Sequence, residues 1–61
     1  MTLADQLRAA RNRKNLTQGQ LAMAIGANQA SVSQWENGKA EPRGDVMAKI
    51  VSLLGALDDA S

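Results

Sequence analysis

Apolar residues recur along this chain at the spacing of amphipathic α-helices. Leu3, Leu7 and Ala10 fall at positions i, i+4 and i+7, so they share one face if residues 3–13 are helical. The segments after residue 17 show shorter stripes of the same period, and glycine or proline separates them. The pattern predicts four helices, over about residues 3–13, 18–25, 29–36 and 45–54.

Residues that start and stop helices lie at the ends of these segments. Thr17 and Gln20 have the spacing of a capping box before the second helix, and Gly26 follows the last residue of that helix. Only Gly26 and Ala27 separate it from Asn28, which is a preferred N-cap residue for the third helix. The second and third helices are therefore expected to be joined by a very short turn.

The same periodicity predicts the buried residues. Trp35 shares the inner stripe of the third helix with Val32, so we expect it to belong to the core rather than to stack on a base. The apolar face of the fourth helix is expected to consist of Val46, Met47, Ile50, Leu53 and Leu54. Ala and Leu favour helices, and aromatic residues are nearly absent, so the fold class predicted for the chain is all-α.

The composition limits the chemistry open to a chain of this size. Sixty-one residues form one small domain, taken here as residues 1–61, and the chain has no cysteine and no histidine. It therefore lacks disulfides, thiolate or imidazole metal ligands, and the commonest general base. We expect no metal, no cofactor, no small-molecule substrate and no enzymatic activity. No apolar run is long enough to span a membrane, and the lack of cysteine fits a cytoplasmic protein.

Charge is distributed unevenly, although the net charge is only +1. Residues 1–43 hold six basic and three acidic residues, whereas residues 44–61 hold one basic and three acidic ones. One end of the domain can therefore face an anion such as DNA, while the acidic end faces away. Arg8 and Lys49 are expected to be solvated charges. Asp58 and Asp59 are expected to be exposed carboxylates rather than a metal site.

Two short helices joined by a glycine-containing turn are typical of a helix-turn-helix unit. In such a unit the second helix lies in the major groove of B-DNA, where side chains near its N-terminus reach the base edges. Gln29 and Gln34 carry amides that can pair with adenine, and Ala30 is small enough to contact a thymine methyl. Cations for the phosphates flank this unit at Arg13, Lys14, Lys39 and Arg43.

A resemblance to a known family is carried by residues 17–42, TQGQLAMAIGANQASVSQWENGKAEP. The segment resembles the helix-turn-helix of phage repressors and Cro proteins, the lambda-repressor-like or XRE-type domains. The shared landmarks are T-Q-x-x-L-A, the glycine of the turn, S-x-W-E-N-G and a proline. The resemblance extends over about residues 3–55. It implies a four-helix domain that binds double-stranded DNA and regulates transcription.

The resemblance also implies roles for individual residues. Gln29, Ala30 and Gln34 match base-reading positions. Gln18 matches a glutamine that binds a phosphate and braces the first recognition residue. Arg11 and Glu36 match a structural ion pair that ties the first helix to the end of the third. The residues assigned to the DNA backbone are Gln18, Asn28, Ser31, Ser33, Asn37, Lys39, Arg13, Lys14 and Arg43.

These observations predict a sequence-specific transcription regulator of the phage or prophage repressor type, which blocks polymerase by occupying an operator. One helix-turn-helix buries too little surface for specific affinity, so we expect a weak homodimer, formed mainly on DNA, on an inverted repeat. Leu53, Leu54 and Leu57 are candidates for the dimer contact, although a core role explains Leu53 better. Many relatives use a fifth helix for this contact, and the chain stops soon after LGAL, so the mode of dimerisation is left open.

A protein-interaction module is the alternative function. The same fold serves in antitoxins and in accessory factors whose binding to DNA depends on a partner. The sequence shows no tail of the kind that wraps a toxin, which favours the repressor. A further interpretation, that the chain is the N-terminal part of a longer repressor, stays open.

Overall fold

The elements of the fold are four α-helices within residues 2–55, the part of the chain that the computed structural model describes. They are α1 (Leu3–Arg13), α2 (Gln18–Ile25), α3 (Gln29–Glu36) and α4 (Gly44–Leu54). The all-α fold class predicted from the sequence is confirmed. The first three helices have the predicted bounds, whereas α4 begins one residue early. Arg43 has the extended conformation of an N-cap residue, so Gly44 is already helical.

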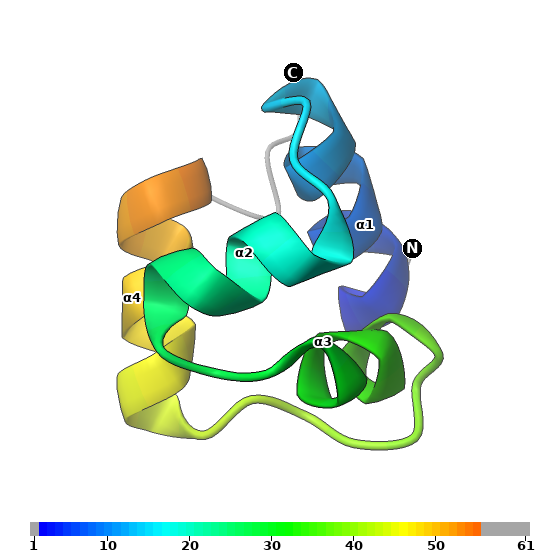
Figure 1. Cartoon of the computed structure of the whole chain (residues 1–61). Helices are drawn as coiled ribbons and strands as arrows, with labels where there is room; N and C mark the ends of the chain where they lie inside the picture. The colour runs from blue at the N-terminus through cyan, green and yellow to red at the C-terminus, as the bar shows by residue number, and fades with distance from the viewer. Residues whose placement is uncertain (1, 56–61) are drawn as a thin grey trace.

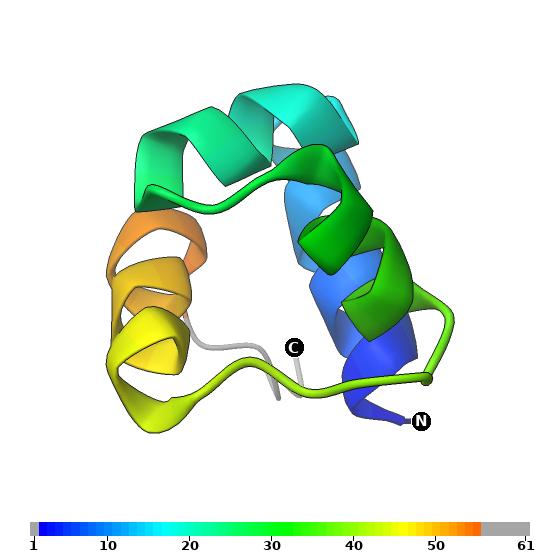
Figure 2. The same ribbon diagram turned by 60° about the horizontal axis from the view of Figure 1, so that its bottom comes forward.

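The helices surround a single core (Figure 1). In both views α1 and α4 lie on opposite sides of the molecule, and α2 crosses between them (Figures 1 and 2). The third helix packs against α2 and α1, and α2 also contacts α4. A long connection then leads from the end of α3 to the start of α4 along one edge of the molecule (Figure 2).

Side chains at the predicted positions cap the N-termini of α2 and α3. The capping box before α2 is complete, because the Gln20 amide N–H donates to Thr17 Oγ1 and the Thr17 amide N–H donates to Gln20 Oε1. At the start of α3 the Ser31 amide N–H donates to Asn28 Oδ1 at 2.8 Å. These local bonds place the first residue of each helix, and they confirm the caps read from the sequence.

The first three helices end in the same way. Each is followed by a residue with a left-handed backbone: Asn15 (φ 58°), Gly26 (φ 74°) and Gly38 (φ 75°). The amide N–H of the next residue then donates to a carbonyl five residues back. This is the longer hydrogen bond of a Schellman motif. The three bonds are Leu16 N to Arg11 O, Ala27 N to Ala22 O, and Lys39 N to Gln34 O.

All four helices contribute to the core. Its buried residues are Leu7, Ala10, Leu21, Ala22, Ile25, Val32, Trp35, Ile50 and Leu54. Trp35 is 8% exposed, so the prediction that it is a core residue is confirmed. No helix among the described residues has the length and apolar character needed to cross a membrane.

One prediction about the core is wrong. Leu53 was expected to be the core residue, but its exposed fraction is 40%, whereas that of Leu54 is 3%. Leu54 follows the fully buried Ile50 by four residues and therefore lies on the same face of α4. Leu54 must consequently be withdrawn as a dimerisation candidate. Leu57, the third candidate, lies outside the described residues.

Candidate nucleic-acid interface

The candidate interface is built on α2, α3 and the turn between them. Ile25 ends α2 and Asn28 already caps α3, so only Gly26 and the residue after it lie between the end of one helix and the cap of the next. The glycine takes φ 74°, a conformation that an L-residue adopts only at a cost. The buried side chains of Leu21, Ile25 and Val32 fix the two helices against the core. A short turn and a shared core thus hold α3 in one orientation.

The exposed face of α3 is polar but uncharged. Gln29, Ala30 and Gln34 are exposed, as is Asn37 directly after the helix, and Ser33 is half-buried between them. The only charged residue of α3 is Glu36, which is 3% exposed and points into the domain. The face therefore offers amide, hydroxyl and methyl groups, without a carboxylate that would repel phosphates or base-edge acceptors.

Several polar side chains beside this face already make structural hydrogen bonds. Asn28 Oδ1 accepts from the Ser31 amide, which leaves the Asn28 Nδ2 group as its free donor. The Asn37 Nδ2 group donates to Ser33 Oγ at 3.3 Å, so the Ser33 hydroxyl keeps its own proton for another acceptor. The bonds orient these side chains and still leave N–H or O–H groups that can reach a phosphate.

Glu36 is the centre of a network that joins three helices. Its Oε2 accepts from Arg11 Nε at 2.6 Å, and its Oε1 accepts from Arg11 Nη2 at 3.0 Å and from Gln18 Nε2 at 3.1 Å. Arg11 also donates through Nη1 to the carbonyl of Leu16 at 2.7 Å. The side chains of Arg11 and Glu36 are 13% and 1% exposed, respectively. The end of α3 is thereby tied to α1 and to the start of α2.

The network shifts the titration of both charged groups. Burial by itself would raise the pKa of the Glu36 carboxyl. The hydrogen bonds from Arg11 and Gln18 and the charges of Arg11 and Arg8 outweigh that effect, so its pKa is lowered. The hydrogen bond to Glu36 raises the pKa of Arg11, and the attraction of the carboxylate adds to this while burial opposes it. Both groups are therefore charged at neutral pH.

The prediction that Arg8 is a solvated charge is wrong. Its Nη2 donates to the main-chain carbonyl of Glu36 at 2.9 Å, and its Nε lies 3.7 Å from Glu36 Oε1. Its side chain is 49% exposed, so one part reaches water while another contacts α3. The sequence held one signal, since Arg8 lies three residues before Arg11 and hence on the same side of α1.

Gln18 makes a structural contact that its assigned role did not include. Its side-chain nitrogen donates to the buried carboxylate of Glu36, and the residue is half-buried at the start of α2. The amide nitrogen has a second N–H, and Oε1 makes no hydrogen bond among the described residues. Gln18 can thus serve the Glu36 network and still offer one donor and one acceptor outward.

The four cations assigned to phosphates, Arg13, Lys14, Lys39 and Arg43, are all exposed. Arg43 Nε lies 4.0 Å from Asp45 Oδ1, with both side chains largely in water. Such an exposed pair is weak and leaves Arg43 free for a stronger anion. Arg8 and Arg11, by contrast, are engaged by Glu36. The exposed cations near the helix-turn-helix are therefore those that flank it rather than those on the inner side of α1.

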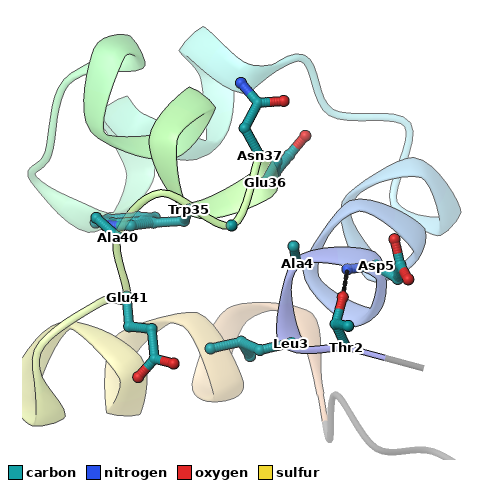
Figure 3. A pocket seen from close by; sticks show the side chains of 10 residues that line it. Thr2, Leu3, Ala4, Asp5, Trp35, Glu36, Asn37, Ala40 and Glu41 are labelled. Atoms are coloured by element: carbon teal, nitrogen blue, oxygen red, sulfur yellow. Dashed lines mark hydrogen bonds between the residues drawn. The ribbon is translucent and has the colours of Figure 1, made fainter.

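A cavity of about 420 Å³ lies between the N-terminus of α1 and the chain after α3. The indole of Trp35, the side chain of Leu3 and the carboxylate of Glu41 line it (Figure 3). Asp5 and Glu36 also line it, and no basic residue does, so its charge does not suit a phosphate. Within residues 2–55, no three His, Cys, Asp or Glu residues are grouped as ligands for a metal ion would be.

The geometry defines a helix-turn-helix domain, and comparison with known families identifies the family to which it belongs. The model of the helix-turn-helix family matches residues 7–58. The chain therefore belongs to this family of lambda-repressor-like, XRE-type domains, whose members are DNA-binding transcription regulators. Neither a search of curated proteins nor a search of solved structures gave a match. Binding of double-stranded DNA is thus the function class of the chain.

Proposed function

We propose that this chain is a sequence-specific repressor of the phage or prophage type, which reads the major groove with α3 and acts by occupying an operator. The observation that carries the proposal is the exposed face of α3. It is uncharged and rich in amides, while four exposed cations flank the unit. The amides suit base edges, and the cations suit the phosphates on either side.

Base reading is assigned to Gln29, Ala30 and Gln34. Gln29 is the first residue of α3, where a recognition helix comes closest to the base edges. Its amide can form a bidentate pair with adenine N6 and N7. Ala30 presents a methyl group that fits beside the thymine methyl. Gln34 lies four residues after Ala30, on the same exposed face, and extends the contact by about one helical turn.

Backbone contacts are assigned to residues around this face. Lys39, Arg13, Lys14 and Arg43 supply charge, and Gln18, Asn28, Ser31, Ser33 and Asn37 supply polar donors. Four cations per protomer predict that a plot of the logarithm of the binding constant against the logarithm of salt concentration has a slope of about −3 to −4 for each bound protomer. Affinity at low salt is then mainly electrostatic, and discrimination comes from α3.

A dimer is proposed because one such domain covers only one half-site. Val51 and Leu53 on α4 are each 40% exposed. They lie on either side of the buried stripe of Ile50 and Leu54, so Leu53 is an apolar contact that this helix still offers. Leu53→Gln should shift the monomer–dimer equilibrium toward monomer, while Met23→Gln, an equally apolar but 80% exposed position on α2, should not. Sedimentation velocity with and without operator DNA measures both, and equal behaviour of the two variants would exclude Leu53 from the contact.

The experiment that tests the function is selection of binding sites from a random duplex library at low salt. An inverted repeat with half-site centres about 10 base pairs apart is expected from a dimeric regulator. A single half-site would refute the dimer but support base reading by α3. If no motif is recovered, the base-reading proposal fails, and the alternative, an antitoxin or accessory factor that needs a partner, becomes the better explanation.

A further inference from the structure

The last turn of α3 leaves four main-chain carbonyls without partners inside the helix, as every α-helix does. In this chain each of these four carbonyls accepts a hydrogen bond, either from the turn that follows α3 or from another helix. The accepting and donating groups are Ser33 O with Asn37 N, Gln34 O with Lys39 N, Trp35 O with Gly38 N, and Glu36 O with Arg8 Nη2. Three donors are main-chain amides next along the chain. The fourth is a side chain from α1, 28 residues away.

We propose that Arg8 is a positioning residue for DNA binding, because it caps the C-terminus of the recognition helix from another helix. The bond of 2.9 Å from its Nη2 to the carbonyl of Glu36 satisfies the last acceptor of α3. Its cation also lies at the negative end of the helix dipole. Arg8 thereby fixes the point at which α3 stops and the chain turns into Asn37, Gly38 and Lys39.

The role of Arg8 is separate from that of Arg11. Both oxygens of the Glu36 carboxylate keep hydrogen bonds from Arg11, and one also keeps the bond from Gln18, when Arg8 is removed. Removing Arg8 therefore leaves no buried charge without a partner, and the fold should persist. What is lost is the only donor, among the described residues, to the main-chain carbonyl of Glu36.

The consequence for DNA rests on the proposed function of the loop after α3. Asn37 and Lys39 are assigned to the phosphates, and they follow the capped carbonyl directly. Arg8 itself is engaged with α3, so it acts on the phosphates through the position of this loop rather than by its own charge. Its loss should weaken binding to all sequences by a similar factor, without relaxing base preference.

The test compares Arg8→Gln with Lys49→Gln in the full chain. Both substitutions remove one positive charge, but Lys49 is exposed on α4 and makes no hydrogen bond or ion pair within the described residues. Binding is measured over a series of salt concentrations, on the selected site and on an unrelated duplex. Amide hydrogen exchange of the free proteins is followed at Lys39 and, as a core reference, at Ile50.

Arg8→Gln should bind both duplexes more weakly than Lys49→Gln, by up to about tenfold, because the loop after α3 must then be ordered on binding, and that cost is limited by the worth of one hydrogen bond. Its salt slope should equal that of the control. Exchange should accelerate at Lys39, whose amide bonds to Gln34 O, and not at Ile50. Arg8→Lys, which keeps a cation and a donor, should restore part of both effects.

Three results would overturn the proposal. Equal affinities of the two variants would show that the cap is not used in binding. A salt slope lower by about one unit for each bound protomer in Arg8→Gln would make Arg8 a phosphate ligand. Faster exchange at Ile50 to the same degree as at Lys39 would mean a general loss of stability. If the wild-type chain selects no site at all, the proposed function fails, while the exchange result still decides whether Arg8 caps α3.

Discussion

Replacing Glu36 by glutamine tests whether the buried ion pair holds the recognition helix in place. The carboxylate accepts three hydrogen bonds, from Arg11 Nε, Arg11 Nη2 and Gln18 Nε2, and its side chain is 1% exposed. Glutamine has almost the same shape but removes the charge and one acceptor oxygen. Arg11, 13% exposed, then keeps its bond to the Leu16 carbonyl and can reach one glutamine oxygen, while the NH2 group of the glutamine replaces its other acceptor.

The expected loss is large for a domain of this size. Breaking one side of a buried, hydrogen-bonded ion pair costs about 2–4 kcal/mol, allowing for the oxygen that glutamine retains. Typical stabilities per residue give a 61-residue chain about 3–9 kcal/mol in total. The midpoint of thermal unfolding should therefore fall by about 8–32 °C, since 1 kcal/mol shifts it by about 4–8 °C in a small domain.

The pH dependence gives an independent measure of the same pair. Because the pKa of Glu36 is lower in the folded than in the unfolded chain, the unfolded chain takes up the proton first as the pH falls. The contribution of the Glu36 carboxylate to stability is complete above the pKa of the unfolded chain, about 4.3. It disappears as the pH falls through the lower pKa of the folded chain. Glu36→Gln lacks this contribution, so its free energy of unfolding should depend less on pH below about pH 5.

The assay is urea and thermal unfolding followed by circular dichroism at a series of pH values. Glu41→Gln is the matched control, because it removes the same charge from an exposed residue that makes no hydrogen bond or ion pair in the described part of the chain. Its midpoint should stay near that of the wild type. If the two variants lose similar stability, or keep the same pH dependence, the Glu36 network does not stabilise the domain as reasoned here.

Three further predictions concern single residues of the interface. Gln29→Ala should cost about 1–3 kcal/mol of binding free energy on the selected operator and relax the preference at one base position in a repeated selection. Unchanged affinity and base preference would mean that Gln29 does not read a base. Lys39→Ala should weaken binding to all duplexes alike and lower the salt slope in titrations by about one unit for each bound protomer, whereas a loss confined to one sequence would contradict a phosphate contact. Gly26→Ala should cost about 1–2 kcal/mol in thermal unfolding, because alanine must adopt φ 74° while its methyl group meets no atom within 4 Å, and a neutral effect would show that the turn adapts.

Local signals made most of the fold predictable from the sequence. Thr17 with Gln20, and Asn28 before α3, cap through bonds to residues three positions away, so the partners are visible in the sequence itself. The left-handed residues Asn15 and Gly26 end their helices in the same local way. Because these bonds need only their near neighbours, tertiary structure is not required to find them.

Two features were not predictable because they depend on relations that sequence patterns do not carry. The partner of Arg8 is a main-chain carbonyl 28 residues away, and a carbonyl has no residue type that could mark it. Leu53 and Leu54 are adjacent and equally apolar, so only the rotation of α4 about its axis decides which one is buried. The base-reading and phosphate assignments remain predictions, since they concern contacts with DNA.

The burial of Trp35 has an optical consequence. The chain has no tyrosine and no phenylalanine, so this indole is the only aromatic side chain. It is 8% exposed, in the last turn of α3, and it lines the cavity beside Leu3 (Figure 3). Its emission therefore reports a single place, the inner side of the end of the recognition helix. A spectral shift on adding a duplex would mean that this end changes its surroundings, with no other fluorophore to blur the signal.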